Sequence, residues 1–154
     1  MSLQIHSSAF QQNGTIPKRY TCDGANRSPP LCWSGLPAGS KSLALIVDDP
    51  DAPDPAAPTM TWVHWVLFNL PPTIHGLSEA ASPLPTGSVS GVNDWQRAGY
   101  GGPCPPVGTH RYFFKLYALD VRLPLRGTAT KADVVGAMPG HVLAEASLVG
   151  TYRR

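Results

Sequence analysis

Three segments of the chain have the hydrophobic patterns of buried β-strands. Residues 42–47 form a continuous apolar run that ends at Asp48-Asp49-Pro50, typical of a strand that is buried on both faces and stopped by proline. Residues 61–69 are rich in aromatic and β-branched side chains between flanking prolines, which predicts a central strand. Residues 110–119 have the pattern of a third strand.

Side chains alternate between the two faces of a strand, so each predicted strand divides into two rows. In residues 61–69, one row is largely apolar and has a histidine near its start: Trp62, His64, Val66 and Phe68. In residues 110–119, a histidine again begins a row of large side chains: His110, Tyr112, Phe114 and Leu116. The two histidines therefore stand near the starts of two strong strands.

Segments rich in proline and glycine lie beside both histidines. Residues 49–55 alternate prolines with carboxylates, so this loop is predicted to have a stiff backbone without regular structure. Residues 99–109 contain too many glycines and prolines to be anything but a loop, and the glycines allow its backbone to approach a ligand. Because rigid loops at strand ends often carry binding residues, the two segments predict a functional site.

The C-terminal part of the chain predicts short helices and a final strand. Thr130 can cap a helix over residues 131–138, with an acidic residue at the third helical position. Residues 141–147 predict a second helical piece, and residues 148–152 predict a last strand.

The composition is typical of a globular protein. The 154 residues are predicted to form a single domain, residues 1–154, because no segment in the middle reads as a flexible linker. Hydrophobic residues make up 42% of the chain and charged residues 14%, which supplies a core and excludes a disordered chain. The formal net charge is only +2 and Lys and Arg are not clustered, so no nucleic-acid partner is expected.

The chain shows no signal for export or for membrane insertion. Its start lacks a basic region followed by an apolar run, and no stretch approaches the roughly 18 apolar residues of a membrane span. These features predict a cytoplasmic protein. The three cysteines, Cys22, Cys32 and Cys104, cannot all pair within one chain and lack the C-x-x-C spacing of a zinc site. Reduced thiols are therefore expected.

The polar residues around the two histidines suit a bound anion. An imidazole, the backbone amides of a glycine-rich loop and a tyrosine hydroxyl can all donate hydrogen bonds to phosphate. We assign to Asp49 the role of accepting a hydrogen bond from a histidine, which orients the ring and favours its imidazolium form. Asp51 is interpreted either as a capping residue of its own loop or as a ligand contact. The positive charge must come from His64 or His110, so affinity for phosphate is expected to weaken as the pH rises.

Several motifs resemble the signature of the phosphatidylethanolamine-binding protein family. They are Asp49-Pro50-Asp51-Ala52-Pro53, Trp62-Val63-His64-Trp65, and Gly102-Pro103 through His110-Arg111-Tyr112. Tyr20-Thr21-Cys22-Asp23-Gly24 and residues 140–146 are similar to the bacterial and archaeal branch of the family.

The resemblance implies a mainly β fold, an antiparallel β-sandwich with short C-terminal helices and a pocket for an anion at one end. It places seven residues in that pocket: Asp49, Asp51, Pro53, His64, Gly102, His110 and Tyr112. Together with the dense prolines, it also predicts a cis peptide bond between Ala52 and Pro53.

These observations predict a binding protein that is not an enzyme, needs no cofactor, and takes a small phosphorylated or other anionic ligand. An inhibitor of a kinase or a protease is the alternative, and a homodimer stays open. A metal-dependent hydrolase is also considered, since two histidines and an aspartate can bind iron or zinc, but an H-E-x-x-H motif is absent. A G-x-S-x-G motif is absent as well, and the proline neighbours of Cys104 keep this candidate nucleophile away from any helix N-terminus.

Overall fold

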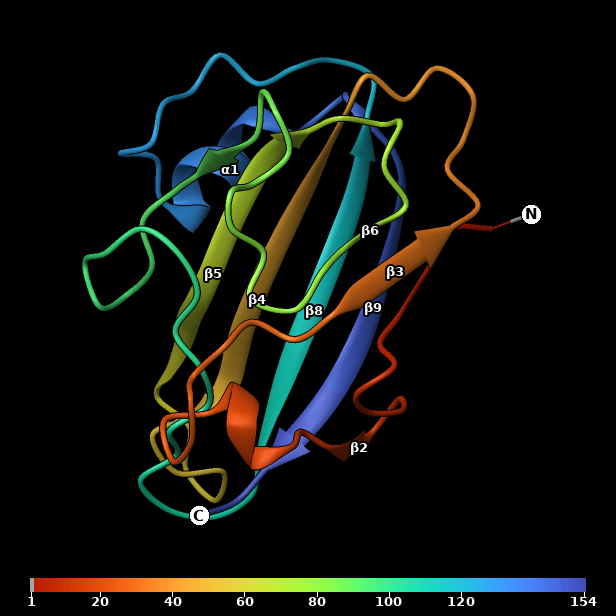
Figure 1. Cartoon of the computed structure of the whole chain (residues 1–154). Coiled ribbons are helices and arrows are strands. Elements are labelled where there is room, and N and C mark those ends of the chain that lie inside the picture. Colours follow the sequence, from red (N-terminus) through yellow and green to blue (C-terminus); the bar gives the residue numbers. More distant parts are fainter. Residues whose placement is uncertain (1) are drawn as a thin grey trace.

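Two β-sheets face each other in the computed structural model, which describes residues 2–154 (Figure 1). The larger sheet has six strands in the order β2 (Gly14–Thr15), β9 (Val142–Tyr152), β8 (His110–Leu119), β4 (Ser42–Ala52), β5 (Met60–Leu70) and β7 (Val89–Ser90). The smaller sheet has the order β1 (Gln4–His6), β3 (Leu31–Ser34) and β6 (Gly76–Leu77). All pairings are antiparallel except that of β2 with β9, so the predicted mainly β sandwich is confirmed.

Apolar side chains fill both faces of the larger sheet. Between the sheets, residues such as Trp33, Leu45 and Phe114 form the main core. On the outer face, a second cluster that includes Ile46 and Phe68 lies under the helix α1 (Lys131–Ala137). Double burial of the central strands explains why residues 43–47 are continuously apolar rather than alternating.

Strand β4 continues past the end that its prolines predict. It runs to Ala52 because from Asp49 onward it pairs only with β5, so Pro50 lies where no donor to β8 is needed. The predicted cis bond between Ala52 and Pro53 is present. The predicted strands at residues 61–69 and 110–119 are confirmed as β5 and β8.

A β-bulge in β5 changes the predicted side-chain rows. Val47 pairs with Trp65 while its neighbour Asp48 pairs with Val63, which leaves His64 as an extra residue. The predicted common face of β5 is therefore wrong: Trp62 and His64 line a cavity, whereas Val66 and Phe68 belong to the outer cluster. In β8 the predicted row is confirmed, since Tyr112, Phe114 and Leu116 all lie in the main core.

The C-terminal segment is mostly strand. The helix predicted over residues 131–138 is confirmed as α1, where Thr130 and Asp133 form a reciprocal capping box. The second helical piece is wrong, because residues 142–152 pair with β8 along its whole length as β9. Tertiary pairing overrides the local helical preference there. Within residues 2–154, α1 is the only α-helix, and no helix is long and apolar enough to cross a membrane.

Replacement of Phe114 by Ala is expected to lower the free energy of unfolding by about 3–5 kcal/mol. The ring is fully buried and packs 5.6 Å from the ring of Phe10, centroid to centroid. Urea denaturation would measure the loss. Val135→Ala, at a position 40% exposed on α1, serves as the control and should change stability by about 0.5 kcal/mol or less. A Phe114→Ala loss no larger than that of the control would contradict this account of the core.

Candidate functional site

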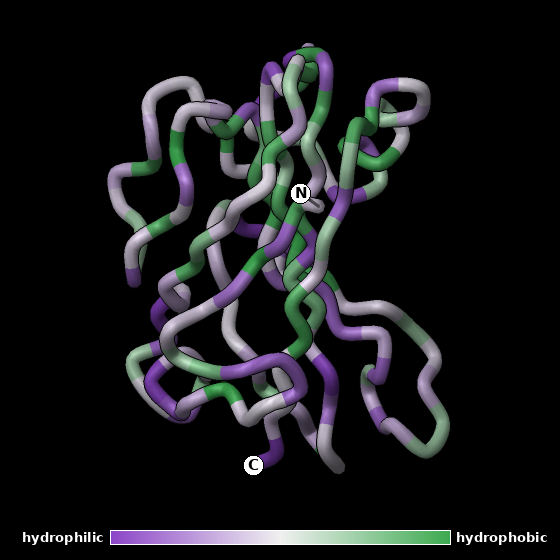
Figure 2. Tube along the Cα trace, turned by 90° about the vertical axis from the view of Figure 1, so that its right-hand side faces the viewer, coloured by the Kyte–Doolittle hydropathy of each residue, from purple (hydrophilic) through white to green (hydrophobic). Residues whose placement is uncertain are grey.

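A cavity of about 310 Å³ opens at one end of the sandwich, where β4, β5 and β8 meet long loops. In Figure 2 the loops around the C-terminus are mostly white and purple, which reflects their Pro, Gly and polar residues. The cavity wall is formed by twelve residues: Asp49, Ala52, Pro53, Met60, Trp62, His64, Trp95, Cys104, Pro105, Pro106, His110 and Tyr112. Five of the seven residues predicted for the site are among them, and Asp51 and Gly102 are not.

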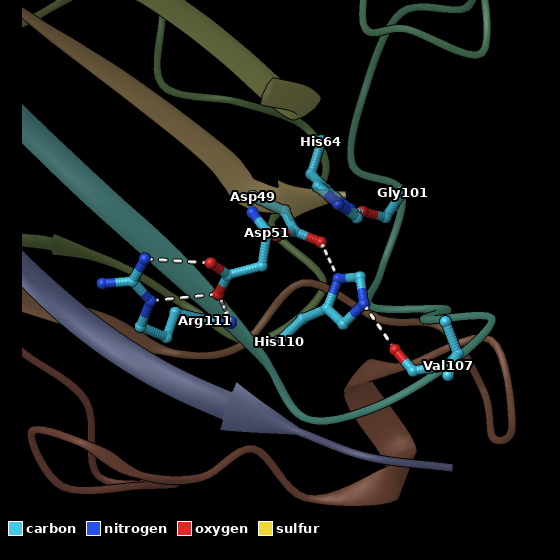
Figure 3. A network of polar contacts seen from close by, with 7 residues as sticks. All are labelled: Asp49, Asp51, His64, Gly101, Val107, His110 and Arg111. Carbon is cyan, nitrogen blue, oxygen red and sulfur yellow. Dashed lines mark hydrogen bonds and ion pairs between the residues drawn. The ribbon is translucent and has the colours of Figure 1, made fainter. Parts of the chain in front are cut away.

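Asp49 and His110 form a buried pair at the cavity (Figure 3). The Nδ1 of His110 lies 2.6 Å from Oδ2 of Asp49, and its Nε2 lies 2.8 Å from the carbonyl oxygen of Val107. The other carboxylate oxygen of Asp49 accepts from the backbone N–H of Asp51 at 2.7 Å. Because a carbonyl oxygen can only accept, Nε2 donates to it, and the pair shares one further proton and has no net charge. Both ring nitrogens of His110 are therefore occupied within the protein.

His64 presents a different face to the cavity. Its Nδ1 donates to the carbonyl oxygen of Gly101 at 2.7 Å, which leaves the lone pair on Nε2. Burial lowers the pKa of His64, although the Gly101 carbonyl and the carboxylates of Asp49 and Asp48 act in the opposite direction. The ring is thus neutral near pH 7. Among the described residues Nε2 has no hydrogen-bond partner.

The Tyr112 hydroxyl is the second polar group at the cavity, and it lies near the carboxylate of Asp49. It is buried and has no hydrogen-bond partner within residues 2–154. Burial, followed by the charge of Asp49, raises the pKa of Tyr112, so the hydroxyl keeps its proton and remains a donor. The ring of Tyr112 lies edge-on to that of His64, with 5.1 Å between centroids, so the two groups belong to one site.

Asp51 and Gly102 have supporting roles outside the cavity. Figure 3 shows Asp51 directed towards Arg111, whose Nη2 and Nε lie 2.9 and 3.0 Å from the carboxylate oxygens. The hydrogen bond from Arg111 lowers the pKa of Asp51. Gly102 donates its backbone N–H to Oδ1 of Asn26 at 2.8 Å, and a Cβ here would collide with the backbone of Tyr20. The Asp51 carboxylate therefore binds Arg111 instead of capping its own loop, and its contact with a ligand stays a prediction.

A match along almost the whole chain identifies the protein family. The sequence model of the phosphatidylethanolamine-binding protein family matches residues 6–153. The chain belongs to this family. A UPF0098 protein of Methanothermobacter thermautotrophicus is 58% identical, over 100% of this chain and 99% of the relative.

Two solved structures extend the likeness to the fold. A phosphatidylethanolamine-binding protein homologue from Chlamydia trachomatis has a TM-score of 0.91 and 43% identity, covering 99% of this chain and 98% of the other. YbcL of E. coli, a member of the mammalian PEBP family, has a TM-score of 0.90 and 34% identity, covering 100% and 99%. The resemblance seen in the motifs is therefore confirmed for the family and the fold.

This family member contains a disulfide that the sequence does not reveal. Cys22 and Cys104 are joined across 82 residues, and Cys22 also donates its backbone N–H to Pro103 at 3.1 Å. The expectation of reduced thiols is wrong for this pair and holds for Cys32, which is free and exposed. Local spacing rules cannot find a pair that only the fold brings together. In this state Cys104 is not a thiol and so is not a nucleophile.

The aromatic part of the wall was missed from the sequence. Trp62 and Trp95 lie edge to face at 5.6 Å, and Trp95 also lies 5.0 Å from the ring of His64. A tryptophan inside a loop is the signal that could have pointed to Trp95. Within residues 2–154, no group of three or more His, Cys, Asp or Glu side chains is arranged to hold a metal ion.

Removal of the disulfide is expected to destabilise the protein. A Cys22→Ser/Cys104→Ser double variant should lose about 2–5 kcal/mol of unfolding free energy, because the bond closes a long loop in the unfolded chain. Urea denaturation without reductant would measure it, with Cys32→Ser as the matched control. Three free thiols in the purified native protein would contradict the pairing.

His64 should also make stability depend on pH. Its pKa is lower in the folded than in the unfolded protein, so below about pH 6.5 the unfolded chain binds the extra proton first. We expect the wild type to lose up to about 1.4 kcal/mol per pH unit more than His64→Gln as the pH falls below that value. Urea denaturation of both proteins at pH 7.5, 6.5 and 5.5 would test this, and identical slopes would refute a buried neutral His64.

Proposed function

We propose that this protein binds, without chemical turnover, a small ligand whose acidic oxygen group, best a phosphate, enters the cavity. The observation that carries the proposal is the pair of free polar groups on adjacent rings, His64 Nε2 and the Tyr112 hydroxyl. A buried hydroxyl without a partner costs about 1–3 kcal/mol, and a ligand oxygen would remove this cost. Membership of a phosphatidylethanolamine-binding protein family supports a ligand of this class.

The rest of the wall favours an apolar group beside the acidic one. Trp62, Trp95 and Met60 lie on the cavity wall, and Met60 is 48% exposed although it is apolar. Ligand sites usually combine such walls with a few polar groups, and 310 Å³ is at the small end of their range of about 300–1,000 Å³. A compact phosphomonoester with an aromatic or short aliphatic group fits this description.

Of the two histidines, His64 is the one that would meet the ligand. Both ring nitrogens of His110 already have hydrogen-bond partners within the protein. We therefore assign to His110 and Asp49 a structural role in the cavity wall. The absence of catalysis is part of the proposal. The cytoplasmic location, a kinase or other protein partner and a homodimer stay predictions.

The proposal is tested by using calorimetry to measure the binding of phenyl phosphate near pH 6. Tyr112→Phe should weaken it roughly tenfold, because one hydrogen bond to a charged group is lost. Tyr117→Phe is the matched control: Tyr117 lies on the same strand but packs against the outer cluster, so affinity should not change. The proposal fails if the wild type does not bind, or if both variants bind equally well.

A further inference from the structure

The cavity offers an anion no free positive charge. None of the lysines or arginines in residues 2–154 belongs to its wall. The charge of His110 is balanced by Asp49 at 2.6 Å, and the buried ring of His64 is neutral. What remains is one acceptor, Nε2 of His64, and one donor, the hydroxyl of Tyr112.

We propose that the pocket selects ligands according to whether they carry an acidic hydrogen. It binds oxyacid groups that still have one and rejects isosteric anions that have none. This inference rests on the proposed function and names the ligand class more narrowly. A phosphomonoester monoanion has both parts, a P–O–H that donates to His64 and a second oxygen that accepts from Tyr112. A sulfate ester of the same shape has only acceptors.

The tautomer of His64 is set by the protein rather than by the ligand. If Nδ1 carried the lone pair, it would face the Gly101 carbonyl oxygen at 2.7 Å, and two acceptors would repel each other. The edges and faces of Trp95 and Tyr112, at 5.0 and 5.1 Å, hold the ring in place. Nε2 therefore stays an acceptor until a proton arrives with the ligand or from solvent.

The charged and titratable groups around His64 do not replace that proton. From β4, the carboxylates of Asp49 and Asp48 favour a charged ring, but burial outweighs them and keeps its pKa below the ordinary value. From β8, Tyr112 stays protonated, and His110 is neutralised by Asp49. A sulfate ester can therefore bind only when solvent protonates the buried imidazole of His64, whereas a phosphomonoester supplies the proton itself.

The second ionisation of a phosphomonoester lies near pH ~6, so at that pH about half of the ligand carries the required hydrogen. For a sulfate ester, each unit by which the pKa of His64 lies below the pH costs a factor of ten in affinity. At pH 6.0 we expect phenyl phosphate to bind more tightly than phenyl sulfate, by about tenfold for each unit by which the pKa of His64 lies below 6.0.

The deciding experiment is calorimetric titration of both esters at pH 6.0 into the wild type, His64→Gln and His75→Gln. A glutamine amide can turn an N–H towards the ligand, so His64→Gln should reduce the preference for phosphate to about threefold or less. His75 is exposed and outside the cavity wall, so His75→Gln should keep the wild-type ratio.

Wild-type titrations alone supply a second measurement if His64→Gln does not fold. Affinity for phenyl phosphate should fall close to tenfold per pH unit between pH 7 and 8.5, because the bound state keeps one proton that the free partners have lost. Equal binding of the two esters, or a flat pH profile, overturns the inference and leaves the proposed function intact. Failure of both esters to bind overturns both.

Discussion

The site depends on one constraint, the attachment of the loop over residues 99–109 to the end of the sandwich. The Gly101 carbonyl accepts from His64, and the Val107 carbonyl accepts from His110, so two backbone oxygens of this loop set the hydrogen-bonding states of both histidines. The loop is itself held to the segment after the 3-10 helix η1 (Lys18–Tyr20) by Gly102–Asn26 and Cys22–Pro103 hydrogen bonds and by the disulfide. The proline and glycine content of the loop permits this backbone conformation, but the contacts with the neighbouring segment determine it.

Three aspartates within four residues of β4 show how the sheet distributes charge. Asp48 is fully buried and accepts from Lys115 and Lys131 at 3.0 and 2.7 Å on the outer face. Asp49 turns to the cavity and binds His110, and Asp51 binds Arg111. Buried carboxylates need such partners, because an unpaired charge away from water is strongly unfavourable. The same residue type therefore serves three separate structural purposes.

The two cavity histidines differ in protonation because they have different partners. His110 has an acceptor at each nitrogen and a carboxylate beside it, which holds the additional proton in the pair. His64 has one carbonyl partner and aromatic rings on its flanks, so burial dominates and the ring is neutral. One rigid and one available imidazole, side by side with a free tyrosine hydroxyl, give the cavity its chemical character.

The sequence alone determined the elements whose patterns are local. Sequence patterns predicted strands β5 and β8, the capped helix α1 and the family motifs. These features depend only on residues that are close together in the sequence. Five of the seven predicted site residues line the cavity, since strand ends and rigid loops converge there.

Only the tertiary structure decided the features that join distant segments. The bulge at His64 depends on the register between β4 and β5, and the strand β9 replaces a predicted helix because β8 supplies its hydrogen bonds. The Cys22–Cys104 bond and the Asp51–Arg111 pair join residues 82 and 60 positions apart. No local pattern encodes such contacts, because their free energy arises only when the chain has folded.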